Sequence, residues 1–246
     1  MQQGIGMISA DYVVIGAGYA GLHCAKKLIE KGLKVLVFDM REVGGELSVF
    51  SKLDVFAKEY DNYIKKIEEL KETIPVEIGT VVKSKPVIVN TKNGLKRFEA
   101  RRALLCTGAA DFLPIKLNVL SKKVTGIYSL DQALRVISEN KRIGERILLV
   151  CKKEKIIEFT EKQLLEMNYS LEVVEVGEKI EIIGDKRVEG VEVEGVRYKC
   201  DTLVFYNGRE PFNPLKLKGT PVGNIAVCSY DYSKVEEHVK NFLSKF

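Results

Sequence analysis

Short apolar runs and one segment of helical periodicity alternate at the start of the chain. A run rich in β-branched residues covers Tyr12–Ile15, and apolar positions recur at helical spacing over Ala20–Lys31. Gly32 marks the end of that helix, and a second apolar run follows at Lys34–Phe38. The pattern predicts a strand–helix–strand unit whose strands are buried on both faces, as in a parallel sheet.

A longer amphipathic pattern follows and then gives way to strands. Apolar residues separated by Lys and Glu predict one helix over Val55–Glu72, which Pro75 ends. Beyond Pro75, Asn93-Gly94 predicts a hairpin turn within a group of short strands. The predicted strands are Val76–Ile78, Val87–Val89, Leu95–Phe98 and Ala103–Cys106.

The strand–helix–strand pattern occurs a second time in the chain. Its predicted parts are the strand Arg146–Val150, the helix Ile156–Met167 and the strand Leu171–Glu175. In both copies the turn and the acid that ends the second strand are almost equally far apart. The other predicted elements are a crossover over Asn118–Gly144 with a helix at Leu130–Ser138, an antiparallel ribbon over Ile180–Val196, a strand at Thr202–Tyr206, a loop over Gly208–Asn224 and a helix at Ser233–Phe246.

Composition narrows the class of protein. The 246 residues, 46% of them apolar and 30% charged, are enough for one large or two modest domains and contain no run of about 18 apolar residues. The 39 basic and 34 acidic residues are interleaved, which favours a solvated surface over a nucleic-acid interface. Met1–Ala10 lacks the basic start of a secretory signal. We therefore expect a cytoplasmic protein with no membrane span and no nucleic-acid partner.

Cysteine and histidine usage argues against a disulfide framework and a metal centre. The five cysteines are scattered without a Cys-x-x-Cys pair. We expect each of them to be a small buried apolar residue. The cysteines are Cys24, Cys106, Cys151, Cys200 and Cys228. Two histidines, His23 and His238, are too few for a histidine metal cluster, so no metal site is expected.

The first turn carries the strongest chemical signal. Gly16–Gly21 fits the pattern G-x-G-x-x-G between a predicted strand and helix, and Asp39 ends the next strand. Gly16 allows the tight turn, Gly18 lets the backbone approach a pyrophosphate, and Gly21 lets the helix pack against the strand. Free amides and the helix dipole favour the phosphate charge, and Asp39 is placed to accept hydrogen bonds from an adenosine ribose.

A second glycine pair, Gly44-Gly45 within Val43–Leu47, follows the acid. With it, the chain resembles the pyridine nucleotide-disulfide oxidoreductase superfamily, whose compact members are the low-molecular-weight thioredoxin reductases. The resemblance spans nearly the whole chain. It is carried by the glycine turn, Asp39, Gly44-Gly45, Leu105–Gly108 and Asp201–Arg209.

The resemblance implies an α/β protein with a Rossmann-like FAD-binding domain and a smaller inserted Rossmann-like domain. The implied domains are residues 1–112 and 201–246 for FAD, and 113–200 for a reduced NAD(P)-type domain. Val82 would offer backbone bonds to adenine. The side chain of Tyr19 is expected to be only a structural neighbour, and Cys106, where alanine is usual, has no expected redox role. The implied FAD contacts are Gly16, Gly18, Tyr19, Ala20, Gly21, Asp39, Met40, Gly44, Gly45, Val82, Thr107, Gly108 and Asp231.

The sequence departs from the family at three places. Side chains fill all three glycine positions of the second turn, Cys151–Ile156. That domain has then either lost nicotinamide binding, leaving Glu175 as a remnant, or meets phosphates through Lys152 and Lys153. The redox Cys-x-x-Cys is missing. Asp231 stands near the family's Gly-Asp pair, and it either replaces that aspartate or only caps the last helix.

We therefore expect an FAD-dependent oxidoreductase without its own disulfide, either stand-alone or a subunit that passes electrons to a partner redox subunit. Flavin-bearing subunits of heteromeric amine and amino-acid dehydrogenases look similar to this layout. The alternatives are a non-catalytic FAD-binding module and an NAD(P)H-dependent flavin reductase. The expected partners are a small-molecule electron donor or acceptor and a redox subunit or a second copy of the chain. No residue is assigned as catalytic.

Overall fold

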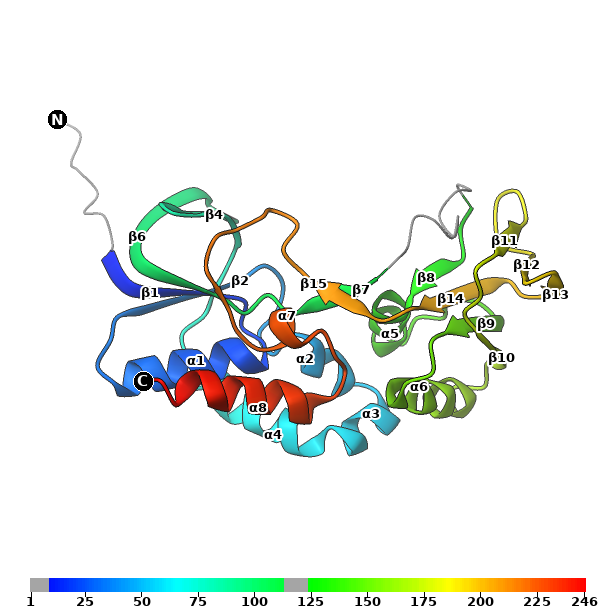
Figure 1. Ribbon diagram of the computed structural model, residues 1–246, viewed down its shortest axis with the longest axis horizontal. Helices are drawn as coiled ribbons and strands as arrows, with labels where there is room; N and C mark the ends of the chain where they lie inside the picture. Colours follow the sequence, from blue (N-terminus) through cyan, green and yellow to red (C-terminus); the bar gives the residue numbers. More distant parts are fainter. Residues whose placement is uncertain (1–8, 113–123) are drawn as a thin grey trace. The chain divides into compact units, whose positions relative to one another are not determined.

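The computed structural model describes residues 9–112 and 124–246, which belong to two compact units (Figure 1). The first unit combines the chain up to Ser48 with Asn62–Ala109 and Pro211–Phe246. The second combines Val49–Asp61 with Ala110–Glu210. The first residues of the predicted crossover, 118–123, and most of Met1–Ala10 lie outside the described residues.

A parallel core sheet organises the first unit. β1 lies between β2 and β6 and pairs in parallel with both, so the predicted unit of strand, helix and strand is present. The order of the main path is β3-β2-β1-β6-β5-β4, and β16 also pairs with β6. The strands are β1 (Ser9–Ile15), β2 (Val35–Asp39), β3 (Glu77–Ile78), β4 (Thr80–Ser84), β5 (Val87–Thr91), β6 (Gly94–Leu105) and β16 (Thr220–Pro221).

β6 is one continuous strand where the sequence predicts two, Leu95–Phe98 and Ala103–Cys106. Its first part pairs antiparallel with β5, and its second part, from Glu99 on, pairs in parallel with β1. Backbone hydrogen bonds hold the polar residues between the two predicted strands, so the apolar pattern breaks while the strand continues. β4 follows Gly79, in the strand region in which Val82 was expected, and it lies on the edge beyond β5.

The sequence also predicts one helix where the chain forms two. α3 (Asp54–Glu59) ends at Tyr60, and α4 (Asp61–Lys71) begins immediately after it. Each helix has an aspartate in its first turn, where a negative charge is favourable. The common apolar periodicity of the two helices hides the break. α3 belongs to the second unit and α4, apart from Asp61, to the first. The first unit also contains α1 (Tyr19–Glu30), α7 (Asn224–Val227) and α8 (Tyr232–Leu243), and α2 (Glu46–Phe50) contains residues of both units.

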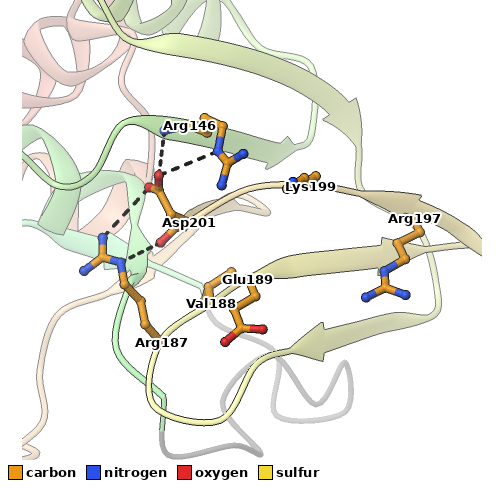
Figure 2. Close-up of a pocket in the computed structure, with 7 residues that line it drawn as sticks. All are labelled: Arg146, Arg187, Val188, Glu189, Arg197, Lys199 and Asp201. Carbon is orange, nitrogen blue, oxygen red and sulfur yellow. Dashed lines mark hydrogen bonds and ion pairs between the residues drawn. The ribbon is translucent and has the colours of Figure 1, made fainter.

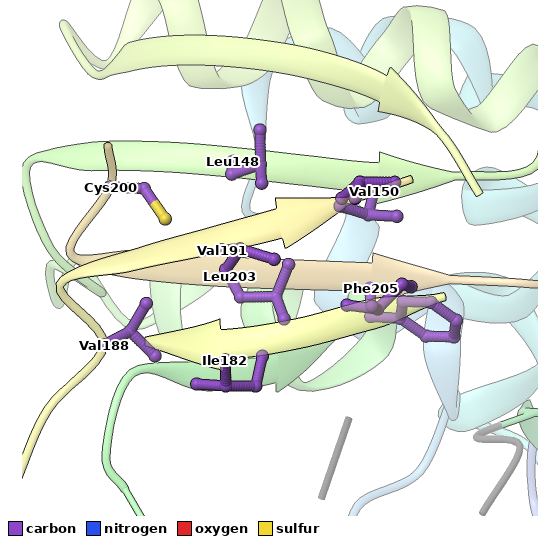
Figure 3. Packing of buried hydrophobic residues seen from close by; sticks show 10 residues of the cluster. Leu148, Val150, Ile182, Val188, Val191, Cys200, Leu203 and Phe205 are labelled. Carbon is purple, nitrogen blue, oxygen red and sulfur yellow. The ribbon is translucent and has the colours of Figure 1, made fainter. Parts of the chain in front are cut away.

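The second unit repeats the parallel design on a smaller scale. Its sheet has the order β10-β9-β14-β8, and an antiparallel ribbon of β11, β12 and β13 packs on it through a buried apolar cluster (Figure 3). α5 (Leu130–Ser138) starts with a capping box, and α6 (Lys155–Glu166) contacts α3. The strands are β8 (Ile127–Ser129), β9 (Arg146–Cys151), β10 (Ser170–Glu175), β11 (Ile180–Ile183), β12 (Gly190–Val193), β13 (Val196–Tyr198) and β14 (Thr202–Tyr206).

The predicted domain boundaries placed residues from 201 onward, and so β14, in the closing part of the FAD domain. β14 pairs with β9 and β8 in the sheet of the second unit instead. All five of its residues are buried, so the strand needs a neighbour on each side and cover on both faces. A short pair of strands, β7 (Ala109–Asp111) and β15 (Arg209–Pro211), stands at the boundary between the units.

Candidate functional site

Three parallel strands of the first unit end at one edge of their sheet. β1 leads into Gly16, β2 ends with Asp39, and β6 leads into Thr107-Gly108. In open parallel sheets, ligands bind at the carboxyl ends of the strands, where such loops meet. The predicted contacts in these loops are therefore brought together at the expected edge.

Two glycines of the first turn are required by the fold itself. Gly16 has a φ of +103°, and a Cβ there would overlap the carbonyl oxygen of Cys106. A Cβ on Gly21 would overlap the carbonyl oxygen of Gly16. Any side chain at either position would force the turn, β6 and α1 apart, so these glycines are explained without a ligand.

Gly18 is not explained in this way. Its φ of −82° and ψ of −165° suit any residue, and a Cβ there would have only the Cα of Gly45, at 3.9 Å, within 4 Å. A Cβ on Gly45 would in turn lie 3.2 Å from the Cα of Gly18. The two glycine backbones thus lie close together, and in the described part of the chain no other atom beyond the chain neighbours of Gly18 would lie within 4 Å of a Cβ there. A bare backbone with free space beside it fits a group that must approach it closely, as a dinucleotide pyrophosphate does.

The amino end of α1 supplies the charge complement to this space. The helix has 12 residues, its N-cap is Gly18 without a side-chain cap, and its first turn contains no acid. The first N–H groups of a helix have no intrahelical acceptor, and the helix dipole adds partial positive charge there. An anion at this end is therefore stabilised by groups that no side chain neutralises.

Asp39 fixes the turn with one oxygen and the chain after β2 with the other. Its Oδ2 accepts from the N–H of Ala17 at 2.7 Å, and its Oδ1 accepts from the N–H of Arg41 at 2.9 Å. The N–H of Gly44 donates to the carbonyl of Ala17 at 2.8 Å. The acid and the second glycine pair therefore meet the first turn through the same residue. Met40, between them in sequence, is 48% exposed.

Tyr19 directs its side chain into the helical layer, as the sequence analysis expects of a structural neighbour. Its hydroxyl donates to Glu236 at 3.0 Å, and its ring lies 4.4 Å from that of His23. Burial, followed by the hydrogen bond to Glu236, raises the pKa of Tyr19 well above its usual range. Lys66 also donates to Glu236, at 2.6 Å, and this contact lowers the pKa of Glu236 to about 2. The side chain of Tyr19 therefore ties α1 to α8.

His23 is a buried group that the sequence analysis did not assign to the site. Its Nε2 is buried and has no hydrogen-bond partner among residues 9–112 and 124–246. Burial, with the positive charge of Lys66, lowers its pKa to about 4. The imidazole is therefore neutral near neutral pH and packs as an aromatic ring against Tyr19.

The Thr107-Gly108 pair is held by the returning chain. The hydroxyl of Thr107 donates to the carbonyl of Phe212 at 2.6 Å, and the N–H of Phe212 donates to the carbonyl of Gly108 at 3.1 Å. The preceding Cys106 is buried, and a hydrogen bond with Cys24 followed by burial raises its pKa well above the usual value. A thiol kept protonated in this way is a poor nucleophile.

Val82 lies at an irregularity of the outer ladder. The register of β4 against β5 shifts between Val81 and Lys83, so the pairing skips Val82, which is 40% exposed. A residue at such a bulge keeps backbone groups outside the ladder. This geometry is compatible with backbone bonds to an adenine, and the role of Val82 stays a prediction.

Asp231 was expected either to replace the aspartate of the family's Gly-Asp pair or only to cap the last helix. Asp231 caps α8, with its Oδ1 accepting from the N–H of Ser233 at 3.0 Å, and hydrogen bonding by Ser233 lowers its pKa. Gly223, with a φ of +78°, lies so close to α1 that a Cβ there would overlap the Cβ of Ala20. Asp231 therefore has the capping role, and a contact of Asp231 with flavin stays a prediction.

Asn224 is a candidate residue that the sequence analysis did not assign to the site. It begins α7, next to the contact of Gly223 with Ala20, and its Oδ1 accepts from the N–H of Ser229 at 2.9 Å. β16 brings it there by pairing with β6, and the N–H of Val222 donates to the carbonyl of Leu105 at 2.9 Å. The Gly-Asn sequence itself was the available signal, because it is one amide away from the family's Gly-Asp.

The corresponding turn of the second unit is filled by side chains. Glu154 accepts from the hydroxyl of Tyr206 at 2.7 Å and lies 3.2 Å from the Nζ of Lys152. Lys153 lies 3.3 Å from Glu175, the acid at the end of β10. Both lysines are therefore paired with carboxylates, and a carboxylate stands at the N-cap of α6 where a phosphate would bind.

No metal centre accompanies these groups in the described ranges, 9–112 and 124–246. No cluster of three or more His, Cys, Asp or Glu side chains there converges as metal ligands would. In the same ranges no helix is both long enough and apolar enough to cross a bilayer.

Comparison with known proteins agrees with this geometry. The family model described as pyridine nucleotide-disulphide oxidoreductase matches residues 10–151. No curated protein sequence matches the chain. Among solved structures, L-proline dehydrogenase from P. horikoshii is 24% identical with a TM-score of 0.64, over 83% of this chain and 43% of that chain. This chain thus spans less than half the length of that protein.

Two further structures share the fold at lower identity. Thioredoxin reductase from Lactococcus lactis is 13% identical with a TM-score of 0.57, over 96% of this chain and 100% of that chain. The HOCl-induced flavoprotein disulfide reductase RclA from Escherichia coli is 11% identical with a TM-score of 0.58, over 94% of this chain and 69% of that chain. At these identities the likeness concerns the fold.

Proposed function

The chain belongs to the pyridine nucleotide-disulphide oxidoreductase family of FAD-dependent oxidoreductases, with FAD as its cofactor, and from this premise we propose that it is an electron-transferring flavin subunit. In this role it receives electrons at bound FAD and passes them to a partner redox subunit of a larger dehydrogenase. It works without a dithiol of its own.

The first unit provides what such a subunit needs to hold FAD. Gly18 leaves its backbone bare, with free space beside it for the pyrophosphate, and the amino end of α1 meets its charge. Asp39 keeps acceptor capacity for a ribose beside its two backbone bonds. Bound FAD supplies the redox chemistry, since its isoalloxazine ring accepts and releases two electrons. The protein groups hold it in place.

The observation that carries the proposal is the filled turn of the second unit. Lys153 stands where the family has its middle glycine, and Glu154 stands at the start of α6. A side chain at the first position blocks backbone approach, and a carboxylate at the second repels phosphate. These features argue against NADH or NADPH as the direct donor, so reducing equivalents have to come from another protein or from a different small molecule.

Anaerobic titration of the FAD-loaded protein tests the proposal. We expect neither NADH nor NADPH to bleach the flavin absorbance, whereas dithionite bleaches it. The reduced flavin then returns its two electrons to an artificial dye acceptor. L-Proline and other amines, tested as small-molecule donors, extend the panel. Stoichiometric bleaching by NADH or NADPH would contradict the proposal and favour a flavin reductase that uses Lys152 and Lys153.

The non-catalytic alternative is distinguished in the same experiment. A flavin module without an electron-transfer role protects its reduced flavin from the dye, so the absorbance stays bleached after dye is added. Rapid return of the absorbance, with one two-electron dye reduced per flavin, supports electron transfer. The Gly18→Val variant, prepared without flavin, provides the blank for direct reaction between dithionite and dye.

A further inference from the structure

A charged pocket lies within the second unit (Figure 2). Its volume is about 770 Å³, within the range of pockets that hold small metabolites. Arg146 is the first residue of β9, and Asp201 immediately precedes β14, so the pocket lies at the amino ends of these parallel strands. The turn with Lys152 and Glu154 follows the opposite, carboxyl end of β9.

Cationic side chains outnumber acidic ones around this pocket. Four cations and two carboxylates line it, which leaves an excess of two positive charges. Asp201 is already shared, with its carboxylate 3.9 Å from Arg146 and 4.0 Å from Arg187. Neither Arg197 nor Lys199 forms an ion pair with a carboxylate of residues 9–112 or 124–246. The charged lining residues are Arg146, Arg187, Glu189, Arg197, Lys199 and Asp201.

Arg187 is held in place by groups other than a ligand. Its guanidinium donates to the carbonyl of Asp201 at 3.0 Å, to the carbonyl of Ile143 at 2.8 Å and to the hydroxyl of Thr202 at 3.1 Å. Three acceptors on two chain segments fix the plane of the group. A fixed guanidinium loses little conformational entropy when an anion binds, which favours affinity.

The backbone that carries the other cations is also anchored. Val188 and Cys200 are 1% and 2% exposed and belong to the apolar cluster between the ribbon and the parallel sheet (Figure 3). Their neighbours in sequence, Arg187, Glu189, Lys199 and Asp201, line the pocket together with Val188. The buried residues therefore anchor the two chain segments that carry these charges.

We propose that this pocket is a binding site for a small multivalent anion, carrying phosphate or carboxylate groups. The excess of two positive charges matches a ligand with at least two negative charges. Arg197 and Lys199 supply the direct charge-assisted hydrogen bonds, and Arg187 supplies a fixed positive wall. This site is separate from the proposed electron transfer, because it uses none of the residues assigned to FAD.

Isothermal titration of the FAD-loaded protein with inorganic pyrophosphate, and separately with citrate, tests the site. We expect at least one of them to bind with a Kd below about 1 mM at low salt and more weakly as salt is raised. The double variant Arg197→Ala/Lys199→Ala loses both direct charge-assisted bonds and is expected to bind at least about tenfold more weakly. Pyrophosphate preference indicates a phosphate ligand, and citrate preference indicates a polycarboxylate.

Two further variants are included, one expected to tighten anion binding and one expected to leave it unchanged. Glu189→Gln removes a repelling carboxylate from the lining, so we expect anion binding to tighten about two- to fivefold. Lys162→Ala removes an exposed cation of the same unit outside the pocket and should leave the Kd unchanged. Flavin absorbance of every variant reports folding of the first unit, and an unchanged far-UV circular dichroism spectrum shows that both units keep their secondary structure.

The proposal is overturned by either of two results. One is that neither pyrophosphate nor citrate binds at concentrations up to about 10 mM. This result overturns the proposal even if an acidic polymer such as polyglutamate binds. The other is binding that persists unchanged in the Arg197→Ala/Lys199→Ala variant, which would place the anion elsewhere. Neither result depends on whether the flavin transfers electrons.

Discussion

The turns that follow β1 and β9 occupy the same place in the two units, between a buried parallel strand and a helix of 12 residues. In the first turn the backbone is bare at Gly18, and the acid Asp39 holds the N–H of Ala17. In the second turn Lys153 and Glu154 fill the corresponding space, and the acid Glu175 pairs with Lys153. One framework therefore supports both an open turn and a filled one, and a few side chains make the difference.

This comparison also separates what the fold needs from what a ligand needs. The second unit forms its strand, turn and helix without any of the three glycines. Glycine is therefore not a general requirement of the design, although Gly16 and Gly21 are required by the close packing of the first copy. At Gly18, in contrast, packing does not require glycine, so a substitution there tests the requirement of the ligand alone.

The largest expected effect comes from placing the same side chain in both turns. Gly18→Val should weaken FAD binding at least about a hundredfold, because its methyl groups occupy the space facing Gly45. Lys153→Val is the matched control and should leave FAD binding unchanged. The ratio of bound flavin to protein after gel filtration measures both. A yellow, FAD-saturated Gly18→Val protein would refute the assignment of the turn.

The two acids give the next largest contrast. Asp39→Ala removes the acceptor of the Ala17 N–H and the expected ribose acceptor, so FAD binding should weaken about tenfold or more. Glu175→Ala removes one exposed ion pair and should change neither FAD binding nor the free energy of unfolding by more than about 0.5 kcal/mol. Flavin fluorescence titration and urea unfolding provide these values. Equal effects of the two substitutions would contradict different roles for the acids.

The helix that follows the first turn, α1, is held by a carboxylate whose contribution to stability depends on pH. Glu236 joins Tyr19 of α1 to Lys66 of α4, and the hydrogen bond from Lys66 lowers its pKa to about 2 from the ordinary 4.5. A lowered carboxyl pKa stabilises the fold fully above pH 4.5, and this contribution is lost as pH falls toward 2. With its side chain 20% exposed, we expect a loss of about 2 kcal/mol.

Glu236→Gln isolates this contribution. Between pH 5 and pH 2.5 the urea unfolding free energy of the first unit should fall less steeply in the variant than in the wild-type protein. Glu237→Gln, at the exposed neighbouring position, serves as the control and should keep the wild-type slope. Parallel slopes for Glu236→Gln and wild type would show that the contact with Lys66 does not set the acid stability.

Much of the fold was predictable because local patterns and packing agree in it. Both parallel units, the ribbon and α5 follow from apolar periodicity and turn residues. The break at Tyr60 was hidden because α3 and α4 share one apolar periodicity. The unit to which β14 belongs was not predictable, because an all-apolar strand fits the centre of either sheet and its partners are far away in sequence.

The site divides in the same way. The glycine turn and Asp39 lie within one local unit, so spacing alone was enough to bring them together. The contact of Gly223 with Ala20 joins opposite ends of the chain through β16, a strand of two residues with no periodicity to detect. The basic pocket was invisible for a related reason, since its cations alternate with buried residues and lie in three separate segments.

The smallest expected effect tests whether the closed turn is stabilised by its own contacts. Tyr206→Phe removes the hydroxyl that donates to Glu154 at 2.7 Å. Because the Glu154 side chain is 32% exposed, we expect this hydrogen bond to contribute about 1 kcal/mol to stability, the value of an ordinary hydrogen bond. Lys152 still pairs with Glu154 in the variant, so the turn stays filled and FAD binding should not change. Urea unfolding followed by circular dichroism measures the difference. A second unit as stable as the wild type would mean that side-chain volume, and not the contact of Tyr206 with Glu154, keeps this turn closed.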